Sequence, residues 1–262
     1  MKKEEIIAAA NSLWISSQDK KAIIQPLTVT YPAITIQDAY HIQLMNVDKK
    51  IERGQKIIGK KVGLTSKAMQ QMLGVPEPDY GHLTDDMVGT EENAISRSTL
   101  LQPKIEAEIA FVLKEKLVGP GVTITKVLQA TEGVIPAFEI IDSRIKDWKI
   151  KIQDTVADNG SSAMIVLGSQ LIPIDQVNLK YVGMALEKNG EIIDTAAGAA
   201  VLGHPALAVA WLANKLAEFE IALEPGEIIL SGSLTKAYEV TGNDLFVANF
   251  GALGSVKVKF AD

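Results

Sequence analysis

The sequence predicts an α+β fold, with a small helical region at the N-terminus followed by a mixed or mostly antiparallel β core that carries a few helices. Apolar residues recur at helical spacing as far as Gly54, whereas runs rich in β-branched residues dominate from Ile95 onward. No internal repeat, low-complexity segment or Pro/Gly/Ser-rich linker divides the 262 residues, which suffice for one large core. We therefore expect a helical or α+β region over residues 1–66 and a β core over residues 67–262.

Three helices are expected in the first part of the chain. The first would bury an apolar face that includes Trp14, and two glutamates ahead of that face argue against a cleaved signal peptide. The second begins at the capping-box-like residues 35–38 and stops at Gly54. The third is short, is capped by Ser66 and ends near Gly74.

The β core is expected from runs that are apolar on both alternating faces or that alternate as half-buried strands do. The expected strands cover residues 56–64, 104–113, 134–141, 228–230, 245–250 and 256–260. Residues 187–192 predict a hairpin, because their Asn-Gly pair favours a type I′ turn. The apolar stretch 196–213 imitates a membrane span, but His204-Pro205 interrupts it, so we expect a buried helix there and no membrane association.

Composition excludes several classes of function. A formal net charge of −6 without a basic tract argues against nucleic acid as a partner, because phosphate binding requires clustered Lys and Arg. The chain has no cysteine, which excludes disulfides, thiolate zinc sites and cysteine nucleophiles. This composition fits a reducing compartment, and we expect a cytoplasmic protein.

Three glutamates lie where a strand normally places hydrocarbon. Glu106 and Glu108 belong to the expected strand 104–113, and Glu139 belongs to the expected strand 134–141. With a side-chain period of two, the first pair shares one face, which continues with apolar residues. Clustered carboxylates in such a setting repel one another unless a cation lies between them. Oxygen ligands favour a hard divalent cation, here Mg²⁺ or Mn²⁺.

The same pattern has a simpler interpretation. Two acids at alternate positions of a strand often form a solvated face near a sheet edge, and a single acid in a strand often pairs with lysine. Within these two strands only Lys104 and Lys114, at the ends of the first, are available to neutralise the acids. The apolar continuation of both faces favours the metal site over this alternative.

Two further residues are candidates for chemistry. Lys61 alternates with Gly59 and Gly63, and glycine on a strand permits close approach of a ligand or another backbone. Such a lysine could hold a substrate carboxylate or move a proton, although a solvent-facing lysine fits the pattern equally well. Asp79 lies in a Pro-Asp-Tyr-Gly turn, where it is either a turn former or a general base near the metal.

The polar loop 155–162 precedes an apolar run, so its short side chains either cap the local backbone or donate hydrogen bonds to a carboxylate. Arg144 is expected in an internal salt bridge, and structural roles are favoured for His41 and His204. The sequence contains nothing like a Ser-His-Asp arrangement, a phosphate loop or a dinucleotide fingerprint.

Six segments carry a family likeness over nearly the whole chain: residues 59–66, 78–81, 102–110, 142–148, 156–159 and 198–205. Together they resemble the hydratase/decarboxylase branch of the fumarylacetoacetate hydrolase superfamily. The resemblance implies a β-roll core and a divalent metal, Mg²⁺ or Mn²⁺, held by Glu106, Glu108 and Glu139. It also implies a homo-oligomer, with the sister enzyme of the same pathway as a further partner.

The resemblance also implies roles for individual residues around a small 2-oxo or 2-hydroxydienoate acid. Lys61 and Asp79 would be catalytic. Contacts to the substrate would come from Leu64, Thr65, Asp158 and Ser161.

The implied reaction is metal-dependent hydration of 2-hydroxypenta-2,4-dienoate (2-oxopent-4-enoate) to 4-hydroxy-2-oxopentanoate in aromatic meta-cleavage catabolism. Residues 142–159 carry that preference. Decarboxylation of 4-oxalocrotonate (2-oxo-3-hexenedioate) is the alternative, because that reaction passes through the same dienolate. A non-catalytic partner that stabilises a hydratase or decarboxylase is a third hypothesis. A C–C hydrolase is disfavoured, since it would need a histidine–acid dyad to activate water.

Overall fold

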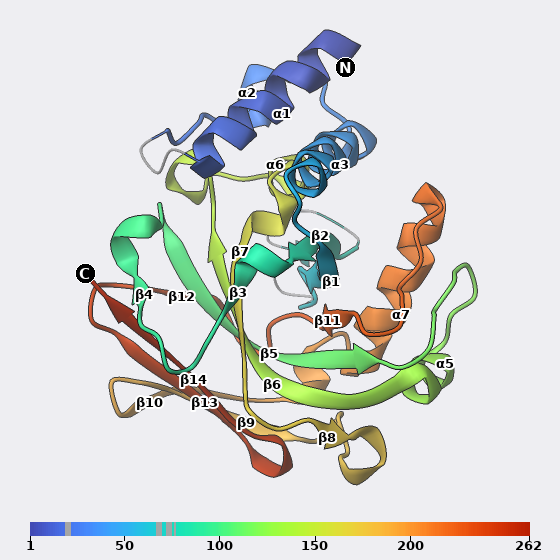
Figure 1. Cartoon of the computed structure of the whole chain (residues 1–262), viewed down its shortest axis with the longest axis vertical. Coiled ribbons are helices and arrows are strands. Elements are labelled where there is room, and N and C mark those ends of the chain that lie inside the picture. Colours follow the sequence, from blue (N-terminus) through green and yellow to red (C-terminus); the bar gives the residue numbers. More distant parts are fainter. Residues whose placement is uncertain (19–21, 67–69, 72–74, 76) are drawn as a thin grey trace.

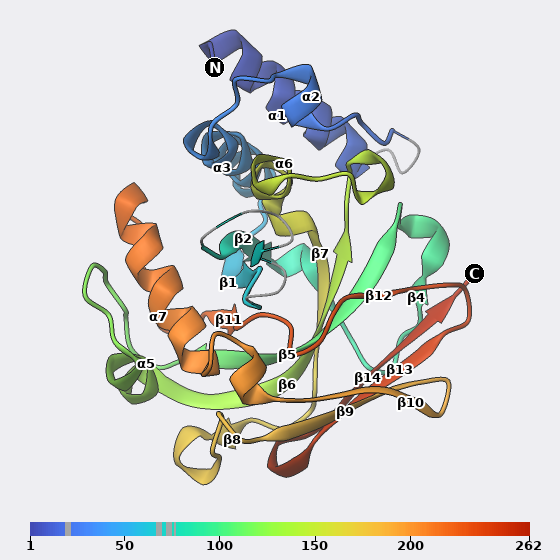
Figure 2. The same cartoon turned by 180° about the vertical axis from the view of Figure 1, so that it is seen from behind.

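The computed structural model describes residues 1–18, 22–66, 70–71, 75 and 77–262, and its strands form two sheets (Figure 1). Four helices gather at the end of the molecule opposite the smaller sheet, and Figure 2 shows the same arrangement from behind. These helices are α1 (Lys3–Gln18), α2 (Leu27–Thr30), α3 (Ile36–Glu52) and α6 (Ile152–Ala157). The predicted α+β fold is confirmed.

The larger sheet has nine strands in the order β2-β1-β11-β5-β6-β7-β3, with β12 paired to β5 and β8 paired to β6. The pairs β1–β11 and β3–β7 are parallel and the other pairs are antiparallel, so the sheet is mixed as predicted. The strands are β1 (Ile57–Gly63), β2 (Asp79–Thr84), β3 (Val88–Gly89), β5 (Pro103–Leu113), β6 (Thr131–Asp142), β7 (Ser162–Leu167), β8 (Ile172–Pro173), β11 (Ile228–Leu230) and β12 (Tyr238–Glu239).

The smaller sheet has five strands in the order β10-β9-β13-β14-β4. The predicted hairpin is present between β9 and β10, with positive φ angles at Asn189 and Gly190 as a type I′ turn requires. The strands are β4 (Ile95–Ser96), β9 (Gly183–Lys188), β10 (Glu191–Ala197), β13 (Leu245–Phe250) and β14 (Gly254–Ala261).

The two faces of β5 have different surroundings. Ile109 and Phe111 point away from the glutamates and join the main apolar core, which also contains Phe138 of β6 and Phe246 of β13. The opposite face of the sheet carries a smaller apolar cluster that includes Ala110. The glutamates therefore share their face with hydrocarbon, as the sequence pattern predicted.

The predicted helices that the structure describes begin close to their expected residues, whereas α2 was not predicted, and α6 extends into the segment 155–162 that was expected to be a loop. Helix α3 starts at a capping box formed by Thr35 and Asp38, and the N-cap of α7 (Pro205–Leu216) is His204, whose Nδ1 accepts a hydrogen bond from the backbone of Ala206. Trp14 is half-buried, and the guanidinium of Arg53 lies 4.5 Å from its ring. The helix predicted after Ser66 falls largely outside the described residues.

The remaining helical segments are short. They are α5 (Ile124–Ala130) and the 3₁₀ turns η1 (Asp85–Met87), η2 (Arg97–Thr99), η3 (Lys146–Trp148), η4 (Asn159–Ser161), η5 (Ile174–Gln176), η6 (Gly198–Ala200), η7 (Ala217–Phe219) and η8 (Gly251–Leu253).

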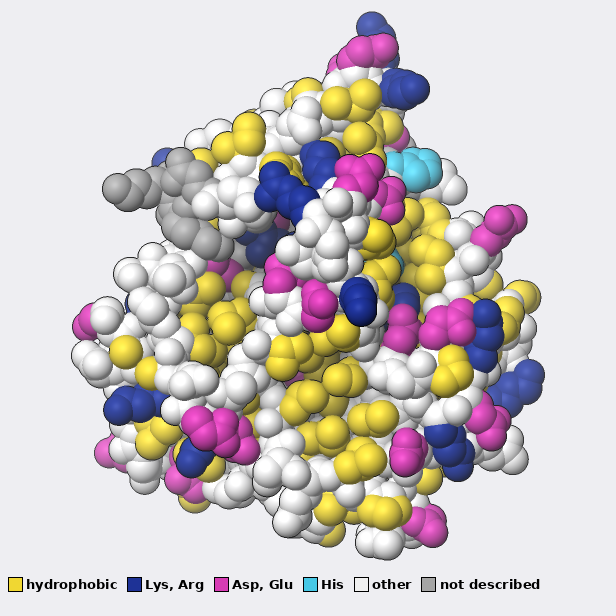
Figure 3. All heavy atoms as spheres, in the orientation of Figure 1, with side chains coloured by type: hydrophobic (Ala, Val, Ile, Leu, Met, Phe, Trp, Pro, Cys, Tyr) yellow, Lys and Arg dark blue, Asp and Glu magenta, His cyan; other side chains and the backbone are white. Residues whose placement is uncertain are grey.

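Basic and acidic side chains are interspersed over the face shown in Figure 3. Within the described ranges, every helix is too short or too polar to cross a bilayer. The boundary expected at residue 66 stays a prediction, and β1, which precedes that residue, lies inside the larger sheet.

Replacing Ile109 by Ala should lower the free energy of unfolding by about 2–5 kcal/mol, because the side chain is fully buried in the main core. Ile192→Ala is the matched control: its side chain is 65% exposed on a strand, so the change should stay within about 0.5 kcal/mol. Urea unfolding measures both values, and similar losses in the two variants would contradict this packing.

Candidate active site

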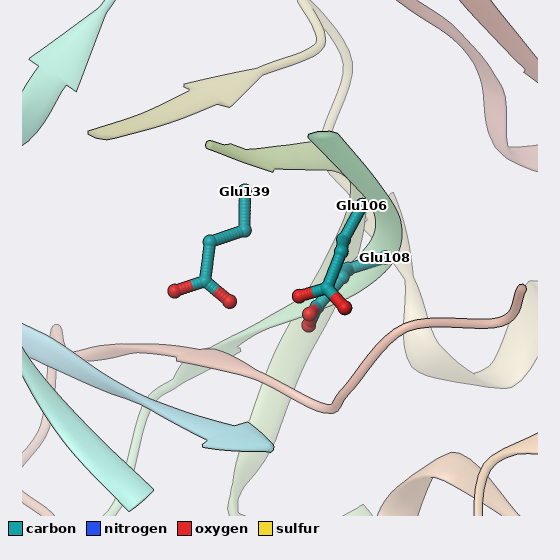
Figure 4. A group of neighbouring side chains, drawn as sticks. All are labelled: Glu106, Glu108 and Glu139. Carbon is teal, nitrogen blue, oxygen red and sulfur yellow. The ribbon is translucent and has the colours of Figure 1, made fainter. Parts of the chain in front are cut away.

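The register of β5 and β6 brings the three glutamates together. Glu106 lies directly opposite Glu139, and Glu108 follows two residues later on the same face. One carboxylate oxygen from each residue lies within 4.8 Å of the others. In Figure 4, Glu106 and Glu108 extend side by side from one strand, and Glu139 approaches the same space from its neighbour.

These carboxylates are poorly satisfied by the protein. Glu108 and Glu139 are buried and Glu106 is half-buried. The backbone N–H of Gly232 donates to Oε2 of Glu108 at 2.7 Å. Among the described residues, Oε1 of Glu108 and both oxygens of Glu139 have no hydrogen-bond partner. Buried carboxylate oxygens without partners carry a large desolvation penalty, which a bound cation would offset.

The same crowding raises the pKa of each carboxyl. Burial is the largest cause for all three, and the charge of Glu139 adds to it at Glu106 and Glu108. The pKa of Glu106 rises to about 7, that of Glu108 rises well above its usual range, and that of Glu139 is raised although Lys61 opposes the shift. A divalent cation would stabilise the ionised form of all three carboxyls.

Lys61 supplies positive charge next to the glutamates. From the sequence alone, only Lys104 and Lys114 were considered for this role. Lys61 pairs with Leu230 of β11, which in turn pairs with Ala110 of β5, so all three side chains lie on the glutamate face. Its Nζ lies 3.5 Å from Oε2 of Glu139, and the side chain is 3% exposed.

The surrounding carboxylates favour the charged form of Lys61 despite its burial. Burial by itself lowers the pKa of the ammonium, but the carboxylates of Glu139, Asp79, Glu106 and Glu108 outweigh it and raise the pKa above the ordinary value. A fixed positive charge beside a cavity can bind a substrate carboxylate or stabilise a developing enolate.

Asp79 begins β2 rather than lying in the turn that the sequence predicted, and it occupies the same face as Lys61. It is buried, and Thr155 Oγ1 donates to its Oδ2 at 3.2 Å. Burial raises the pKa of Asp79, and the charge of Lys61 partly opposes that shift. Gly63 stands directly opposite Asp79, and a Cβ at Gly63 would lie 2.1 Å from the carboxylate, so only glycine permits this approach.

A cavity of about 230 Å³ lies beside these groups. Six predicted site residues line it: Lys61, Leu64, Thr65, Asp79, Glu106 and Ser161. Asp158 is not among the lining residues. Its carboxylate is buried and accepts hydrogen bonds from the backbone N–H and the Nε of Arg144, which makes the internal salt bridge that the sequence predicted. Ser161 Oγ lies 3.4 Å from Oδ2 of Asp158.

Sequence reasoning missed several lining residues. Lys104 lies two positions before Glu106 and therefore on the same face, a signal that strand alternation already contained. Its Nζ lies 4.6 Å from the ring of Trp148, which also lines the cavity. Lys236 and Ser233 line it too, and Ser233 Oγ has no hydrogen-bond partner among the described residues. Ser233 lies in a Ser-Gly-Ser turn that gave no functional signal.

Comparisons with known proteins agree with this geometry. A sequence model described as fumarylacetoacetate (FAA) hydrolase C-terminal matches residues 56–261. The chain is 54% identical over 204 residues to a 2-hydroxypent-2,4-dienoate hydratase of Pseudomonas putida, covering 78% of this chain and 92% of that protein. It is 47% identical over 241 residues to a 2-hydroxyhexa-2,4-dienoate hydratase of Comamonas testosteroni, covering 91% of each.

A solved structure agrees over almost the full length. The 4-oxalocrotonate decarboxylase from Pseudomonas putida G7, complexed with magnesium and adipate, matches with a TM-score of 0.96 and 38% identity, covering 99% of this chain and 98% of that chain. This chain therefore belongs to the fumarylacetoacetate hydrolase family, as the sequence motifs indicated.

Replacing Glu108 by Gln should lower the affinity of the cluster for Mg²⁺ or Mn²⁺ by at least about 100-fold, since changes to residues that only support a ligand already cost about 10- to 100-fold. Isothermal titration calorimetry measures this. Glu191→Gln, at an exposed strand position, is the control and should bind as the wild type does. Unchanged affinity in Glu108→Gln would show that the cluster is not a cation site.

The affinity for the metal should also rise with pH through neutrality. A protonated carboxyl is a poor ligand. Burial, together with the charge of Glu139, raises the pKa of Glu106 to about 7 and that of Glu108 above its usual range. Below those pKa values binding must displace protons, so affinity increases as the carboxyls ionise. Calorimetry in buffers of different ionisation enthalpy counts the released protons, and proton uptake on binding would contradict the assignment.

Proposed function

We propose that this chain is a metal-dependent hydro-lyase that converts 2-hydroxypenta-2,4-dienoate and water to 4-hydroxy-2-oxopentanoate in aromatic meta-cleavage catabolism. The observation that carries the proposal is the buried cluster of Glu106, Glu108 and Glu139 beside a cavity that Lys61 and Asp79 also line. The sequence identity of 54% between this chain and a 2-hydroxypent-2,4-dienoate hydratase supports the choice of reaction.

The three glutamates would hold the metal, which we propose is Mg²⁺ or Mn²⁺ because every candidate ligand atom is a carboxylate oxygen. When bound, such a cation supplies Lewis-acid stabilisation of negative charge at the C2 oxygen of a 2-oxo acid. The protein contributes the orientation of the substrate and the movement of protons.

Lys61 would bind the substrate carboxylate or stabilise the enolate. The surrounding carboxylates raise the pKa of its ammonium, which favours the charged form. Lys61 also lines the cavity, where this charge can act on the substrate. Leu64, Thr65 and Ser161 line the same cavity and would orient the rest of the substrate. Asp158 would act indirectly, by holding the segment that carries Ser161.

Asp79 would transfer protons or position water. Burial raises its pKa above the ordinary value of an aspartate, although the charge of Lys61 opposes the shift. Asp79 would accept the C2 hydroxyl proton of the dienol and return a proton to C5, so that the dienol becomes an α,β-unsaturated ketone and Asp79 regains its starting protonation state. Water then adds across the C3–C4 double bond, with its hydroxyl at C4 and its hydrogen at C3. The product is 4-hydroxy-2-oxopentanoate, and no further co-reactant is needed.

Decarboxylation of 4-oxalocrotonate is the second candidate, and one observation favours it. Lys104 and Lys236 line the cavity together with Lys61, so three ammonium groups are available to a substrate with two carboxylates. The structurally similar decarboxylase was solved with adipate, which is itself a dicarboxylate. The lower identity of 38% to that enzyme places this candidate second.

The proposal extends to assembly and location. We propose a homo-oligomer, and Tyr181, which is 69% exposed, offers apolar surface that a second copy could cover. A complex with the sister decarboxylase of the pathway is a further proposed partnership. The absence of cysteine supports a cytoplasmic location.

The decisive experiment follows the ultraviolet absorbance of 2-hydroxypenta-2,4-dienoate with purified protein, with Mg²⁺ or Mn²⁺ and with a chelator. We expect metal-dependent decay and 4-hydroxy-2-oxopentanoate as the product. Release of CO₂ from 2-oxo-3-hexenedioate would favour the decarboxylase. A protein inert alone with both substrates, and active only when mixed with a sister enzyme, would favour the stabilising partner.

A lysine variant tests the site within the same assay. Lys61→Met should lower kcat by about 100- to 1,000-fold, the cost of removing one positioned group that stabilises an oxyanion. Lys259→Met, at an exposed position of β14, is the matched control and should keep wild-type turnover. Equal activity in the two variants would remove Lys61 from the mechanism.

A further inference from the structure

The part of the chain before residue 56, which the family model does not match, reaches the site through one buried side chain. Gln43 of α3 is 1% exposed. Its Nε2 donates to the carbonyl of Tyr80 in β2 at 2.9 Å and to the carbonyl of Val156 in α6 at 2.7 Å. One amide therefore ties two segments that are far apart in the sequence.

The remaining oxygen of Gln43 is satisfied as well. Its Oε1 lies 3.0 Å from Nδ1 of His82. Because the NH₂ group of Gln43 faces the two carbonyls, the atom that faces His82 is the amide oxygen Oε1. An amide oxygen only accepts hydrogen bonds, so Nδ1 of His82 must carry the proton. Burial lowers the pKa of His82 to about 3, which keeps the imidazole neutral in this arrangement.

The two tied carbonyls flank the contact that orients Asp79. Tyr80 follows Asp79 directly, and Val156 follows Thr155 directly. Thr155 Oγ1 donates to Asp79 Oδ2 at 3.2 Å. Gln43 therefore helps to fix the distance between β2, which carries Asp79, and α6, which carries Thr155. Its own hydrogen bonds go to backbone carbonyls and to His82.

A second tie holds the neighbouring turn η4. The side chain of Asn159 accepts from the backbone N–H of His82 at 2.8 Å and donates to the carbonyl of the same residue at 2.9 Å. The approach is close, because a Cβ at Gly81 would lie 2.4 Å from the carbonyl oxygen of Asn159. The turn then presents Gly160 to Lys61, where a Cβ would lie 2.5 Å from Cε of the lysine.

We propose that Gln43 is a positioning residue for the reaction, through which the N-terminal helical region sets the geometry of Asp79 and Lys61. The expected effect on turnover rests on the proposed function, whereas the contacts of Gln43 are independent of the substrate. Loss of the amide removes one hydrogen-bond donor from each of two carbonyls and weakens the link between β2 and α6. Small misplacements of a catalytic group lower the rate of the chemical step steeply.

The test is Gln43→Met, which keeps the length of the side chain and removes its hydrogen bonds. We expect kcat to fall about 10- to 100-fold, because displacement of a catalytic group by roughly 1 Å has an effect of that order. KM should stay within about twofold, since Gln43 does not line the cavity. Thr155→Val should give a similar loss, and the double variant should be no slower than the worse single variant.

Gln37→Met is the matched control, because Gln37 is exposed on the same helix, and it should leave kcat unchanged. Should Gln43→Met fail to fold, Gln43→Asn shortens the amide by one methylene and gives the same comparison. A role limited to stability would lower the midpoint of thermal unfolding while the folded enzyme kept its kcat, and that result would overturn the proposal.

Amide hydrogen exchange separates this proposal from the proposed function. In Gln43→Met, peptides covering residues 79–84 and 155–161 should exchange at least about 10-fold faster, while peptides of β13 and β14 stay unchanged. Wild-type protein that does not turn over the dienoate would overturn the proposed function alone. Unchanged exchange in both peptides would overturn the role of Gln43, whatever the substrate.

Discussion

The structure depends on one electrostatic constraint: three carboxylates share one face of a sheet, and among the described residues one ammonium group, that of Lys61, forms a salt bridge with one of them. Glu106, Glu108 and Glu139 repel one another, and the ion pair between Lys61 and Glu139 compensates only part of their charge. Burial raises the pKa values of all three glutamates, and the charge of Glu139 adds to the shift at Glu106 and Glu108. A protein can keep such a cluster when a cation completes it, which links the fold to metal-dependent chemistry.

Within the cluster, Glu108 and Glu139 are buried, whereas Glu106 is half-buried and lines the cavity. Apolar side chains continue the glutamate face, and the opposite face of the same strands is anchored in the main core. Glycines at positions 63 and 160 leave room for Asp79 and Lys61 to approach their neighbours closely. The rigid central strands therefore carry the charged groups, while turns such as η4 bring the remaining polar groups to the cavity.

Sequence reasoning located the acids well because strands impose a strict alternation. Glu106 and Glu108 had to share a face once their run was read as a strand, and Lys104 belonged to the same face by the same rule. It could not assign Lys61 to that face, because the link runs through β11, a strand from near the other end of the chain. The likeness of residues 59–66 to a known family was the only earlier indication. Gln43 gave no signal at all, since a glutamine within an amphipathic helix has no distinctive pattern.

The sequence by itself determined the α+β class, the two glutamate strands, the hairpin at residues 187–192 and the family, because these features depend on local periodicity, turn chemistry or motif order. Only the tertiary structure decided which strands became neighbours, which face Lys61 and Asp79 occupied, and that Asp158 pairs with Arg144 rather than lining the cavity. Register between distant strands and the partners of buried polar groups are non-local properties. They are settled by the packing of the whole chain, and no single segment encodes them.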